Sequence, residues 1–355
     1  MGRSDWLIYG ANGYTGALTA QMAVERGMRP ILAGRNTAAV GALAQRLGLA
    51  ARSAALDDPQ ALDRMLAGCH AVLHCAGPFV HTAKPMADAC LRNGVHYLDI
   101  TGEISVFEAL AARYAEARSA GVMLLPGAGF DVVPSDCLAA HLNRRLPGAS
   151  RLVLGIRSSG GVSRGTATTM LESIERGEGG LVRRDGALVR VPAAAKSRAI
   201  DFGGGPRPAV LMPWGDVSTA YHSTGIPTIE VYMSFTPPVI RAMQASARLG
   251  WLLRMPGVMG LLKRRVQSGA PGPDDEQRAN GRSLLWGMVE DDQGKRAESL
   301  LRTPEAYTLT ALTSLLIMRK VLAGQVRSGY QTPSSAYGPD LILEIPGVER
   351  ADVPM

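Results

Sequence analysis

The sequence predicts an α/β protein of two domains, of which the first has a doubly wound parallel sheet and the second is a mixed α+β domain. Short apolar runs alternate with helical segments over residues 1–140, which is typical of βα units around a parallel sheet. A glycine-rich turn, residues 10–16, directly follows the first apolar run and opens a helix. The 355 residues also exceed the roughly 250–300 at which a single hydrophobic core stops growing.

The first domain is expected over residues 1–147. Its strands are predicted where short apolar runs show little polar alternation, as expected of strands covered on both faces: 6–9, 30–33, 51–56, 71–75, 96–100 and 122–125. Helices are predicted in the Ala-, Leu- and Arg-rich segments that follow them: 17–26, 38–47, 59–67, 85–92, 106–119 and 136–145. This alternation predicts a Rossmann domain.

The second domain is expected over residues 148–303, where longer strand-like runs replace the βα alternation. The predicted strands are 151–157, 187–191, 228–235 and 283–290, and residues 165–175 form a predicted helix. A last helix, 304–323, ends before Gly324, a residue type that favours helix C-caps. We expect the tail 304–355 to pack back on the first domain, so that the second domain is an insertion.

Composition and charge exclude several classes of protein. The net charge of +7 comes from scattered arginines without the basic cluster that nucleic-acid binding requires. No segment has the ~20 apolar residues of a membrane span, and the N-terminus does not resemble a signal peptide, so a cytoplasmic protein is expected. The four cysteines form no CxxC pair and no metal-ligand spacing with the histidines, which predicts reduced thiols and no metal site.

The turn between the first strand and first helix has the spacing of a dinucleotide-binding site. Gly10 permits the tight turn, Gly13 lets the backbone approach a diphosphate, and Gly16 allows close packing of helix and strand. The helix N-terminus then offers free N–H groups to the phosphates. We predict that the intervening Asn12, Tyr14 and Thr15 also contact the cofactor; a glycine turn without a ligand is the alternative.

The end of the second strand predicts which dinucleotide binds. NAD-binding domains usually place Asp or Glu there to bind the ribose 2′-hydroxyl, whereas this strand ends in Gly34-Arg35. A guanidinium suits a 2′-phosphate, so NADP(H) is the predicted cofactor. The alternative is that Arg35 is an exposed strand-end charge.

Two further turns are expected along the cofactor, since ligands of such sheets bind at the carboxyl ends of strands. Asp57 either accepts from the adenine amino group or caps the helix that begins at Pro59. The turn Ala76-Gly77-Pro78-Phe79 follows the fourth strand and should lie along the ribose. Phe79 either lines the nicotinamide pocket or belongs to the core.

Several motifs together resemble the saccharopine dehydrogenase-like family, and within it most the branch that includes trans-acting enoyl reductases. They are residues 10–16, 33–35, 75–79, 96–103 and 126–136. The resemblance implies a Rossmann domain with a substrate domain, NADP(H) and hydride transfer. Saccharopine reductases carry a Pro-Gly-x-Asp-His type of motif, whereas no histidine follows Asp131 here, so saccharopine is not the expected substrate.

Hydride transfer to a carbonyl or enoyl group also needs a group that satisfies the developing anion. Glu103 and Asp131 lie just past strand ends, where catalytic groups are common, and either could donate a proton if burial raised its pKa. Tyr97, on the fifth strand, is the third catalytic candidate, and Phe130 is expected beside the substrate. The alternative for each carboxylate is helix capping or bonding to backbone amides.

Three residues of the second domain lie in a segment that resembles the family's substrate region: Arg157, Arg164 and Thr166. An arginine there would bind a substrate carboxylate or phosphate, and a solvated surface arginine is the alternative. Residues 238–265 are basic and amphipathic, which is compatible with a membrane-surface contact, a lid over a lipid-like substrate, a dimer interface or a core helix. We expect the chain to form a homodimer.

The sequence therefore predicts an NADP(H)-dependent oxidoreductase that reduces a C=C, C=N or C=O group of a small or acyl-chain metabolite. No proton donor is unmistakable in the sequence. A protein that binds NADP without turnover, as a sensor or scaffold, is therefore the alternative.

Overall fold

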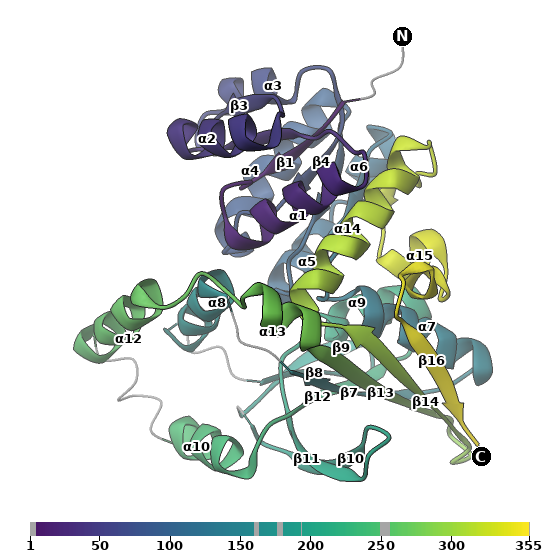
Figure 1. The fold of residues 1–355 in the computed structure, drawn as a ribbon. Helices are drawn as coiled ribbons and strands as arrows, with labels where there is room; N and C mark the ends of the chain where they lie inside the picture. The colour runs from purple at the N-terminus through teal and green to yellow at the C-terminus, as the bar shows by residue number, and fades with distance from the viewer. Residues whose placement is uncertain (1–4, 160–162, 176–179, 193, 249–255, 355) are drawn as a thin grey trace. The chain divides into compact units, whose positions relative to one another are not determined.

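The computed structural model describes the chain except residues 1–4, 160–162, 176–179, 193, 249–255 and 355 (Figure 1). The chain divides into two compact units, which are treated separately below. Unit 1 comprises residues 1–133 and 307–337, and unit 2 comprises residues 134–306 and 338–355. Residues 134–306 of unit 2 are thus inserted between the two parts of unit 1, and residues 338–355 follow the second part.

Within its described residues, unit 1 is built on a seven-stranded sheet in which all strand pairs are parallel. The strand order is β15-β6-β5-β4-β1-β2-β3. The predicted doubly wound parallel sheet is thereby confirmed, with one extra strand at its edge. The strands are β1 (Asp5–Tyr9), β2 (Ile31–Gly34), β3 (Ala51–Ser53), β4 (Cys69–His74), β5 (His96–Asp99), β6 (Met123–Leu125) and β15 (Gly329–Tyr330).

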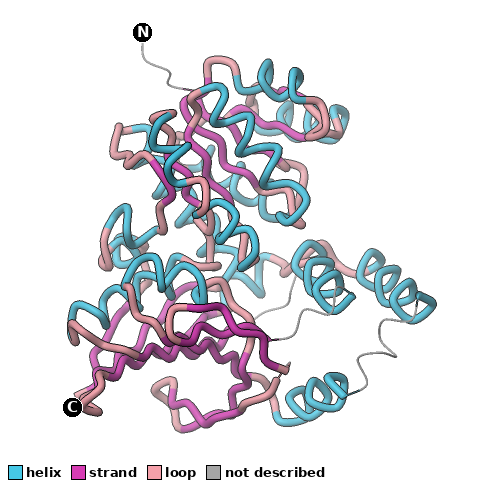
Figure 2. Tube along the Cα trace, turned by 180° about the vertical axis from the view of Figure 1, so that it is seen from behind, coloured by secondary structure: helices cyan, strands magenta, loops and turns pink. Residues whose placement is uncertain are grey.

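Helices flank the strands of unit 1 (Figure 2). They are α1 (Tyr14–Glu25), α2 (Thr37–Leu47), α3 (Pro59–Leu66), α4 (Phe79–Asn93), α5 (Ile104–Ala111), α6 (Tyr114–Ser119), α14 (Ala306–Leu322) and α15 (Pro333–Tyr337). Side chains alternate across a strand, so Leu7 and Ile8 point to opposite faces of the sheet, yet both are fully buried. Burial on both faces explains why these strands are continuous apolar runs.

Unit 2 contains a mixed sheet of nine strands among the residues described. Its main path is β10-β11-β12-β7-β13-β14-β16, with β8 paired to β12 and β9. Only β7 and β12 pair in parallel there. The strands are β7 (Arg151–Ser158), β8 (Gly180–Arg184), β9 (Ala187–Val191), β10 (Ser197–Asp201), β11 (Pro206–Leu211), β12 (Thr228–Ser234), β13 (Arg282–Glu290), β14 (Arg296–Pro304) and β16 (Glu349–Val353).

One face of the unit 2 sheet is packed closely by a helix. A Cβ atom on Gly287 of β13 would lie 2.5 Å from a methyl carbon of Leu142, so glycine lets α7 approach the sheet. On the opposite face, Val153, Tyr232 and Trp286 form a core cluster. The helices of unit 2 are α7 (Val133–Arg145), α8 (Arg164–Glu175), α9 (Asp216–Thr224), α10 (Pro237–Arg248), α12 (Pro256–Ser268) and α13 (Asp275–Asn280), with a 3₁₀ turn at Leu341–Glu344.

The units differ from the domain ranges expected from sequence, 1–147, 148–303 and 304–355, in two places. Helix α7 groups with unit 2, because it packs on β13 through Gly287. Residues 307–337 group with unit 1, but residues 338–355 return to unit 2 because β16 pairs with β14. Strand β14 escaped prediction, since its buried positions include the hydroxyl residues Ser299 and Thr303 beside apolar ones.

Several element bounds also differ from prediction. Helix α4 begins at Phe79 and contains Pro85, where a helix start was expected. The expected helix 106–119 is divided into α5 and α6, and the expected strand 51–56 ends at Ser53. All four cysteines lie in the described part of the chain and are free thiols. No helix in the described residues is long and apolar enough to cross a membrane.

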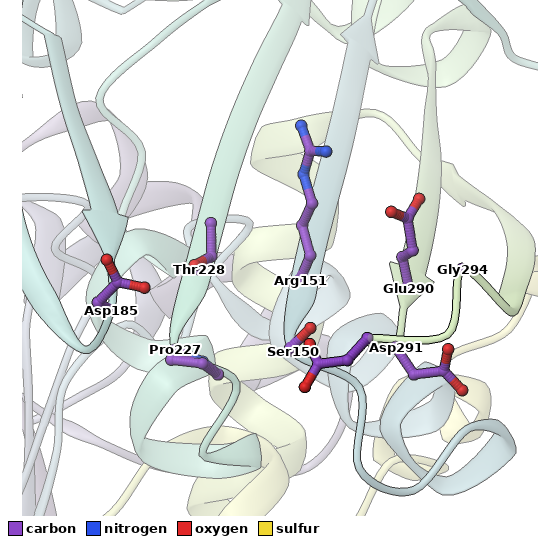
Figure 3. A pocket seen from close by; sticks show the side chains of 9 residues that line it. Ser150, Arg151, Asp185, Pro227, Thr228, Glu290, Asp291 and Gly294 are labelled. Atoms are coloured by element: carbon purple, nitrogen blue, oxygen red, sulfur yellow. The ribbon is translucent and has the colours of Figure 1, made fainter.

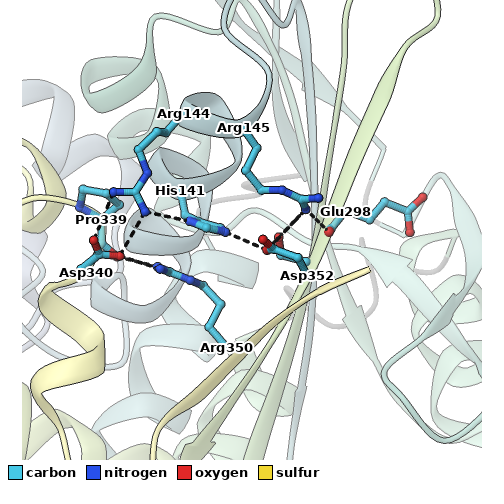
Figure 4. A network of polar contacts seen from close by, with 9 residues as sticks. His141, Arg144, Arg145, Glu298, Pro339, Asp340, Arg350 and Asp352 are labelled. Atoms are coloured by element: carbon cyan, nitrogen blue, oxygen red, sulfur yellow. Dashed lines mark hydrogen bonds and ion pairs between the residues drawn. The ribbon is translucent and has the colours of Figure 1, made fainter. Parts of the chain in front are cut away.

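A network of polar side chains attaches β16 to the rest of unit 2 (Figure 4). Asp352 accepts hydrogen bonds from His141 Nε2 and Ser299 Oγ, both at 2.8 Å, and lies 3.4 Å from Arg145 Nη1. Burial lowers the pKa of His141, which favours a neutral ring that donates through Nε2 and accepts at Nδ1 from Arg144. Partial burial raises the pKa of Asp352, but the bonds from His141 and Ser299 outweigh it and lower that pKa.

We predict that Asp352→Ala lowers the free energy of unfolding by about 1 kcal/mol, a modest loss because the carboxylate is half exposed. Because the folded-state pKa of Asp352 lies below its unfolded value, its ionised carboxylate stabilises the protein at pH values above the ordinary aspartate pKa. This stabilisation is lost as the pH falls through the folded-state pKa. Chemical denaturation at pH 7 should therefore separate the variant from wild type, and the difference should shrink in acid. Glu349→Ala, on the same strand, is the control; an equal effect there would contradict the account.

Candidate active site

The turn between β1 and α1 has room only for glycine at two positions. Gly10 has a φ of +79°, and a Cβ atom there would lie 2.8 Å from the backbone nitrogen of Ala76. A Cβ on Gly16 would lie 2.4 Å from the carbonyl oxygen of Gly10. A Cβ on Gly13 would meet only that same carbonyl, at 3.3 Å, so the backbone at Gly13 has an open side. Gly10 and Gly16 therefore have no room for a side chain, whereas Gly13 is less restricted.

The N-terminus of α1 differs from those of the next two helices. Asn36 caps α2 by accepting from Ala39 N at 3.0 Å, and Asp58 caps α3 by accepting from Ala61 N at 2.9 Å. Among the described residues, no side chain caps α1, which begins directly after Gly13. An uncapped helix start beside an open glycine is suited to an anionic group.

The other residues of this turn are arranged around it. Asn12 is exposed, and its Oδ1 would lie 3.2 Å from a Cβ on Gly34. The Tyr14 ring packs edge-on against Tyr307, with ring centroids 5.2 Å apart. The Thr15 carbonyl accepts from the Thr19 hydroxyl within α1. The structure therefore brings Asn12 and Gly34 together, and places Tyr14 against α14.

Two opposite charges lie at the corner formed by the ends of β2 and β3. Arg35 is exposed directly after β2, and Asp57 is exposed after β3. Burial raises the pKa of Tyr9, the Arg35 charge lowers it and the Asp57 charge raises it, so both charges act on the same hydroxyl. The capping residue of α3 is Asp58, so helix capping does not account for Asp57.

The turn after β4 contacts the glycine turn, but its aromatic residue is buried. Ala76 lies against Gly10, and the Ala76 carbonyl accepts from the Thr82 hydroxyl at 2.6 Å. Gly77 and Pro78 then lead into α4. Phe79 is 8% exposed and belongs to the core cluster of unit 1, which favours the core alternative over a pocket wall.

Sequence reasoning missed His74, the last residue of β4. The ring is fully buried and contacts Phe79 edge-on, with centroids 5.3 Å apart. Neither ring nitrogen has a hydrogen-bond partner in the described part of the chain, and burial lowers the pKa to about 3, so the ring is neutral. A single histidine in an apolar strand gives no sequence signal of this kind.

Glu103 has the capping role that was the alternative to catalysis. Its Oε1 accepts from Phe79 N at 2.7 Å and its Oε2 accepts from Val80 N at 2.8 Å, at the start of α4. Both carboxylate oxygens therefore bind backbone amides that α4 cannot satisfy internally. The geometry argues against Glu103 as a proton donor, and the expectation that it is catalytic is corrected accordingly.

Tyr97 also has a role inside the core, where it is buried and hydrogen-bonded to Asp99. Its side chain is fully buried, and its hydroxyl donates to Asp99 Oδ2 at 2.6 Å. Burial raises its pKa well above the usual value, so it is a poor acid. The geometry therefore argues against the expectation that Tyr97 is catalytic, because its hydroxyl is bonded to Asp99. Burial raises the pKa of Asp99 to about 6, while hydrogen bonds from Tyr97, Thr101 N and Gly127 N lower it.

Asp131, after β6, has a different environment from these two acids. Its Oδ1 is buried and has no hydrogen-bond partner among the residues described. Burial raises its pKa to about 7, so the carboxyl is substantially protonated at neutral pH. Gly102 lies so close that a Cβ there would be 2.5 Å from Asp131 Oδ2. A neutral carboxyl with an unpaired oxygen is the arrangement expected of a proton donor.

The neighbouring Phe130 is hydrogen-bonded to helix α14. Its backbone N–H donates to the Thr310 hydroxyl of α14 at 2.9 Å, and its side chain is 8% exposed. Gly129 allows this contact, because a Cβ there would lie 2.8 Å from the Thr310 methyl carbon. Helix α14 therefore holds the loop that carries Asp131.

The other three predicted substrate residues lie in unit 2. Arg157 is exposed at the end of β7. Arg164 donates through Nη1 to the carbonyl of Gln267, which ties α8 to the end of α12. The N–H of Thr166 donates to Ser163 Oγ at 3.2 Å, so Ser163 caps the start of α8, another role that sequence reasoning missed. Arg164 and Thr166 thus have local structural contacts.

The basic amphipathic segment 238–265 falls on α10 and α12, and its residues 249–255 lie outside the described part. On α12, Leu261 is 69% exposed while Met259 is buried. Arg264 and Arg265 are exposed beside Leu261. The exposed face of α12 is therefore basic with one large apolar side chain.

A hollow of 420 Å³ lies in unit 2 where β7 and β12 begin and β13 ends (Figure 3). Arg151 is the cation among its lining residues, whereas the carboxylates are Asp185, Glu290, Asp291 and Asp292. The excess of negative charge disfavours an anionic ligand. This hollow is therefore no candidate for a phosphate-bearing cofactor.

Residues 6–125 match the family described as the saccharopine dehydrogenase NADP binding domain. The match spans the glycine turn, Arg35, and the strands β1 to β6 that support them. Residues 6–125 are therefore similar to a saccharopine dehydrogenase NADP-binding domain. The resemblance predicted from the sequence is confirmed over these residues.

Named relatives share part of the chain. A Mycobacterium tuberculosis protein provisionally assigned as a trans-acting enoyl reductase is 34% identical over 182 residues, which cover 47% of this chain and 43% of the relative. A trans-acting enoyl reductase of Mycobacterium ulcerans is 31% identical over 147 residues, covering 39% of this chain and 35% of that protein. The chain matches less than half the length of these relatives.

The whole fold is similar to that of apo saccharopine dehydrogenase (L-Glu forming) from Saccharomyces cerevisiae. The TM-score is 0.67, with 99% of this chain and 100% of the yeast chain covered, at 14% sequence identity. At this identity the similarity shows the fold alone. The saccharopine dehydrogenase fold therefore extends beyond the NADP-binding domain to both units.

We predict that Glu103→Ala lowers the free energy of unfolding by about 1–2 kcal/mol, the usual loss when a helix N-terminus loses its acceptor. Denaturant titration should detect the change. Glu103→Gln keeps one side-chain acceptor oxygen and should recover part of the loss. If Glu103→Ala left stability unchanged but abolished reductase turnover, the capping role would be wrong.

Proposed function

We propose that the protein is an NADPH-dependent reductase of a C=C, C=N or C=O group, with Asp131 as its proton donor. The observation that carries this proposal is the buried, unpaired Oδ1 of Asp131, on a carboxyl whose pKa is about 7. A carboxylate in this state is costly unless a partner or a proton compensates it. Its position after β6 lies at the sheet edge where ligands of such domains bind.

The residues of the β1–α1 turn fit a dinucleotide diphosphate. The two glycines that exclude a Cβ, Gly10 and Gly16, bring the backbone into a tight turn beneath the uncapped start of α1. Gly13 leaves an open side for close approach of a phosphate. Arg35, exposed after β2 where no carboxylate stands, would bind a 2′-phosphate and favour NADP(H) over NAD(H).

A bound nicotinamide cofactor supplies the hydride, so the chain must supply the proton that completes the reduction. Glu103 binds two amides and Tyr97 donates to Asp99, so neither is free to do so. Asp131 at neutral pH holds a proton and has an unpaired oxygen. We assign it the transfer of that proton to the carbanion, amide or alkoxide that hydride addition creates.

An acyl-chain substrate with a conjugated C=C bond is the favoured choice among the three acceptors. The named relatives are trans-acting enoyl reductases, and the shared segment includes this domain. Arg157, exposed at the end of β7, would bind an anionic group of such a substrate. A panel of enoyl thioesters, enones, aldehydes and imines with NADPH identifies the reduced group.

We predict that Arg35→Ala raises the Kd for NADPH by about 10- to 100-fold, since charge-assisted hydrogen bonds contribute roughly 1.5–3 kcal/mol. The Kd for NADH should change little. Fluorescence titration with both cofactors measures the two constants, and Arg46→Ala, an exposed arginine of α2, is the matched control. Equal losses for NADPH and NADH would show that Arg35 does not read the 2′-phosphate.

We predict that Asp131→Asn lowers kcat by about 10²- to 10⁴-fold, the usual contribution of a general acid, without changing the Kd for NADPH. Steady-state NADPH oxidation with the best acceptor of the panel measures the change. Asp292→Asn, an exposed acid of unit 2, is the control. Unchanged kcat in Asp131→Asn would exclude the donor role, and tight NADPH binding without turnover of any acceptor would favour a binding protein.

A further inference from the structure

We propose that Asp99 is a positioning residue that sets the place of the Asp131 carboxyl, an inference that rests on the proposed role of Asp131 as proton donor. Asp99 ends β5 and is fully buried. Its Oδ1 and its carbonyl oxygen accept from the two loops that meet at Asp131, and its Oδ2 accepts from Tyr97 on the same strand. We call Asp99 and its four donors the Asp99 clamp: the donors are Tyr97 Oη and the N–H groups of Thr101, Gly127 and Ala128.

The Asp99 clamp joins the loop after β5 to the loop after β6 through a single oxygen atom. Asp99 Oδ1 accepts from Thr101 N and from Gly127 N, each at 2.9 Å. The carbonyl of Asp99 accepts from Ala128 N at 2.7 Å. Two amides that are far apart in sequence are therefore held by one carboxylate oxygen, which fixes the spacing of the two loops.

The loop after β5 carries Gly102, and the loop after β6 carries Asp131, which lies against it. Gly102 directly follows Thr101, and a Cβ on Gly102 would lie 2.5 Å from Asp131 Oδ2. On the other loop, the carbonyl of Gly127 accepts from Val132 N at 3.1 Å, which closes the loop around Asp131. A change in the spacing between Thr101 and Gly127 would therefore move Gly102 relative to the Asp131 carboxyl.

The remaining oxygen of Asp99 is held by Tyr97. The Tyr97 hydroxyl donates to Oδ2 at 2.6 Å, which fixes the rotation of the carboxylate so that Oδ1 points at both amides. This contact also gives the fully buried hydroxyl of Tyr97 a hydrogen-bond partner, on a strand that ends at the candidate site. Tyr97 and Asp99 thus act on the reaction through Asp131 and contact no substrate.

The variants Asp99→Ala and Asp99→Asn separate positioning from a general loss of stability. Alanine removes every side-chain acceptor, whereas asparagine keeps an oxygen for both amides and offers its NH₂ group to the Tyr97 oxygen. We expect Asp99→Ala to lower kcat by about 10²-fold, the effect of a displacement near 1 Å, with little change in KM or in the Kd for NADPH. Asp99→Asn should recover most of that loss.

If Asp99→Ala does not fold, a second variant tests the positioning of the Asp131 carboxyl through Gly102 instead of Asp99. Gly102→Ala places a Cβ against Asp131 Oδ2 while the Asp99 clamp is intact, so it should also lower kcat with little change in NADPH binding. Asp274→Ala removes the capping box of α13 in unit 2 and is the control for lost stability alone. It should leave kcat per folded molecule unchanged.

The decisive comparison is made in the Asp131→Asn background. A residue that acts through Asp131 has no further effect once the donor is gone, so Asp99→Ala should not lower the kcat of Asp131→Asn any further. Multiplied losses in the double variant, or no recovery in Asp99→Asn, would overturn the positioning role while leaving Asp131 as donor. An unchanged kcat in Asp131→Asn alone would overturn the proposed function and this inference together.

Discussion

Parallel pairing of the unit 1 strands places their carboxyl ends at one edge of the sheet, and the candidate site depends on that constraint. The glycine turn follows β1, Arg35 follows β2, the Ala76 turn follows β4 and Asp131 follows β6. Parallel pairing alone therefore brings residues that are far apart in sequence to the same edge. The close approach of Gly10 to Ala76 shows how tightly these neighbouring turns are packed.

The four carboxyl or phenol groups at this edge, Tyr97, Asp99, Glu103 and Asp131, differ in whether their hydrogen bonds are satisfied. Glu103 binds the two amides at the start of α4, and Asp99 with Tyr97 binds the two loops beside Asp131. These groups are fully partnered and stabilise the framework. Asp131 has an unpaired oxygen, and burial holds its pKa near neutrality. An aspartate at this edge can thus either hold the loops, as Asp99 does, or remain unpaired, as Asp131 Oδ1 does, depending on the hydrogen-bond donors around it.

The sequence was sufficient for the features that depend on local spacing: the glycine turn, the six βα strands, the arginine after β2 and the family. It could not distinguish Glu103 from Asp131, because both follow strand ends and only the fold shows which carboxyl meets backbone amides. His74 and Ser163 also gave no sequence signal, because the burial of the His74 ring and the bond from Thr166 N to Ser163 Oγ are seen only in the fold. Strand β16 was missed because its pairing with β14 is a contact between residues about fifty positions apart.

The central claim is that Asp131 holds a proton at neutral pH beside the bound cofactor. Carbon-13 NMR of protein labelled at the aspartate carboxyls measures this directly, with Asp131→Asn identifying the signal. The account predicts a carboxyl that titrates at about pH 7 and shifts when NADPH binds. A signal that titrates near the ordinary aspartate value of about 4, or that ignores NADPH, would contradict it.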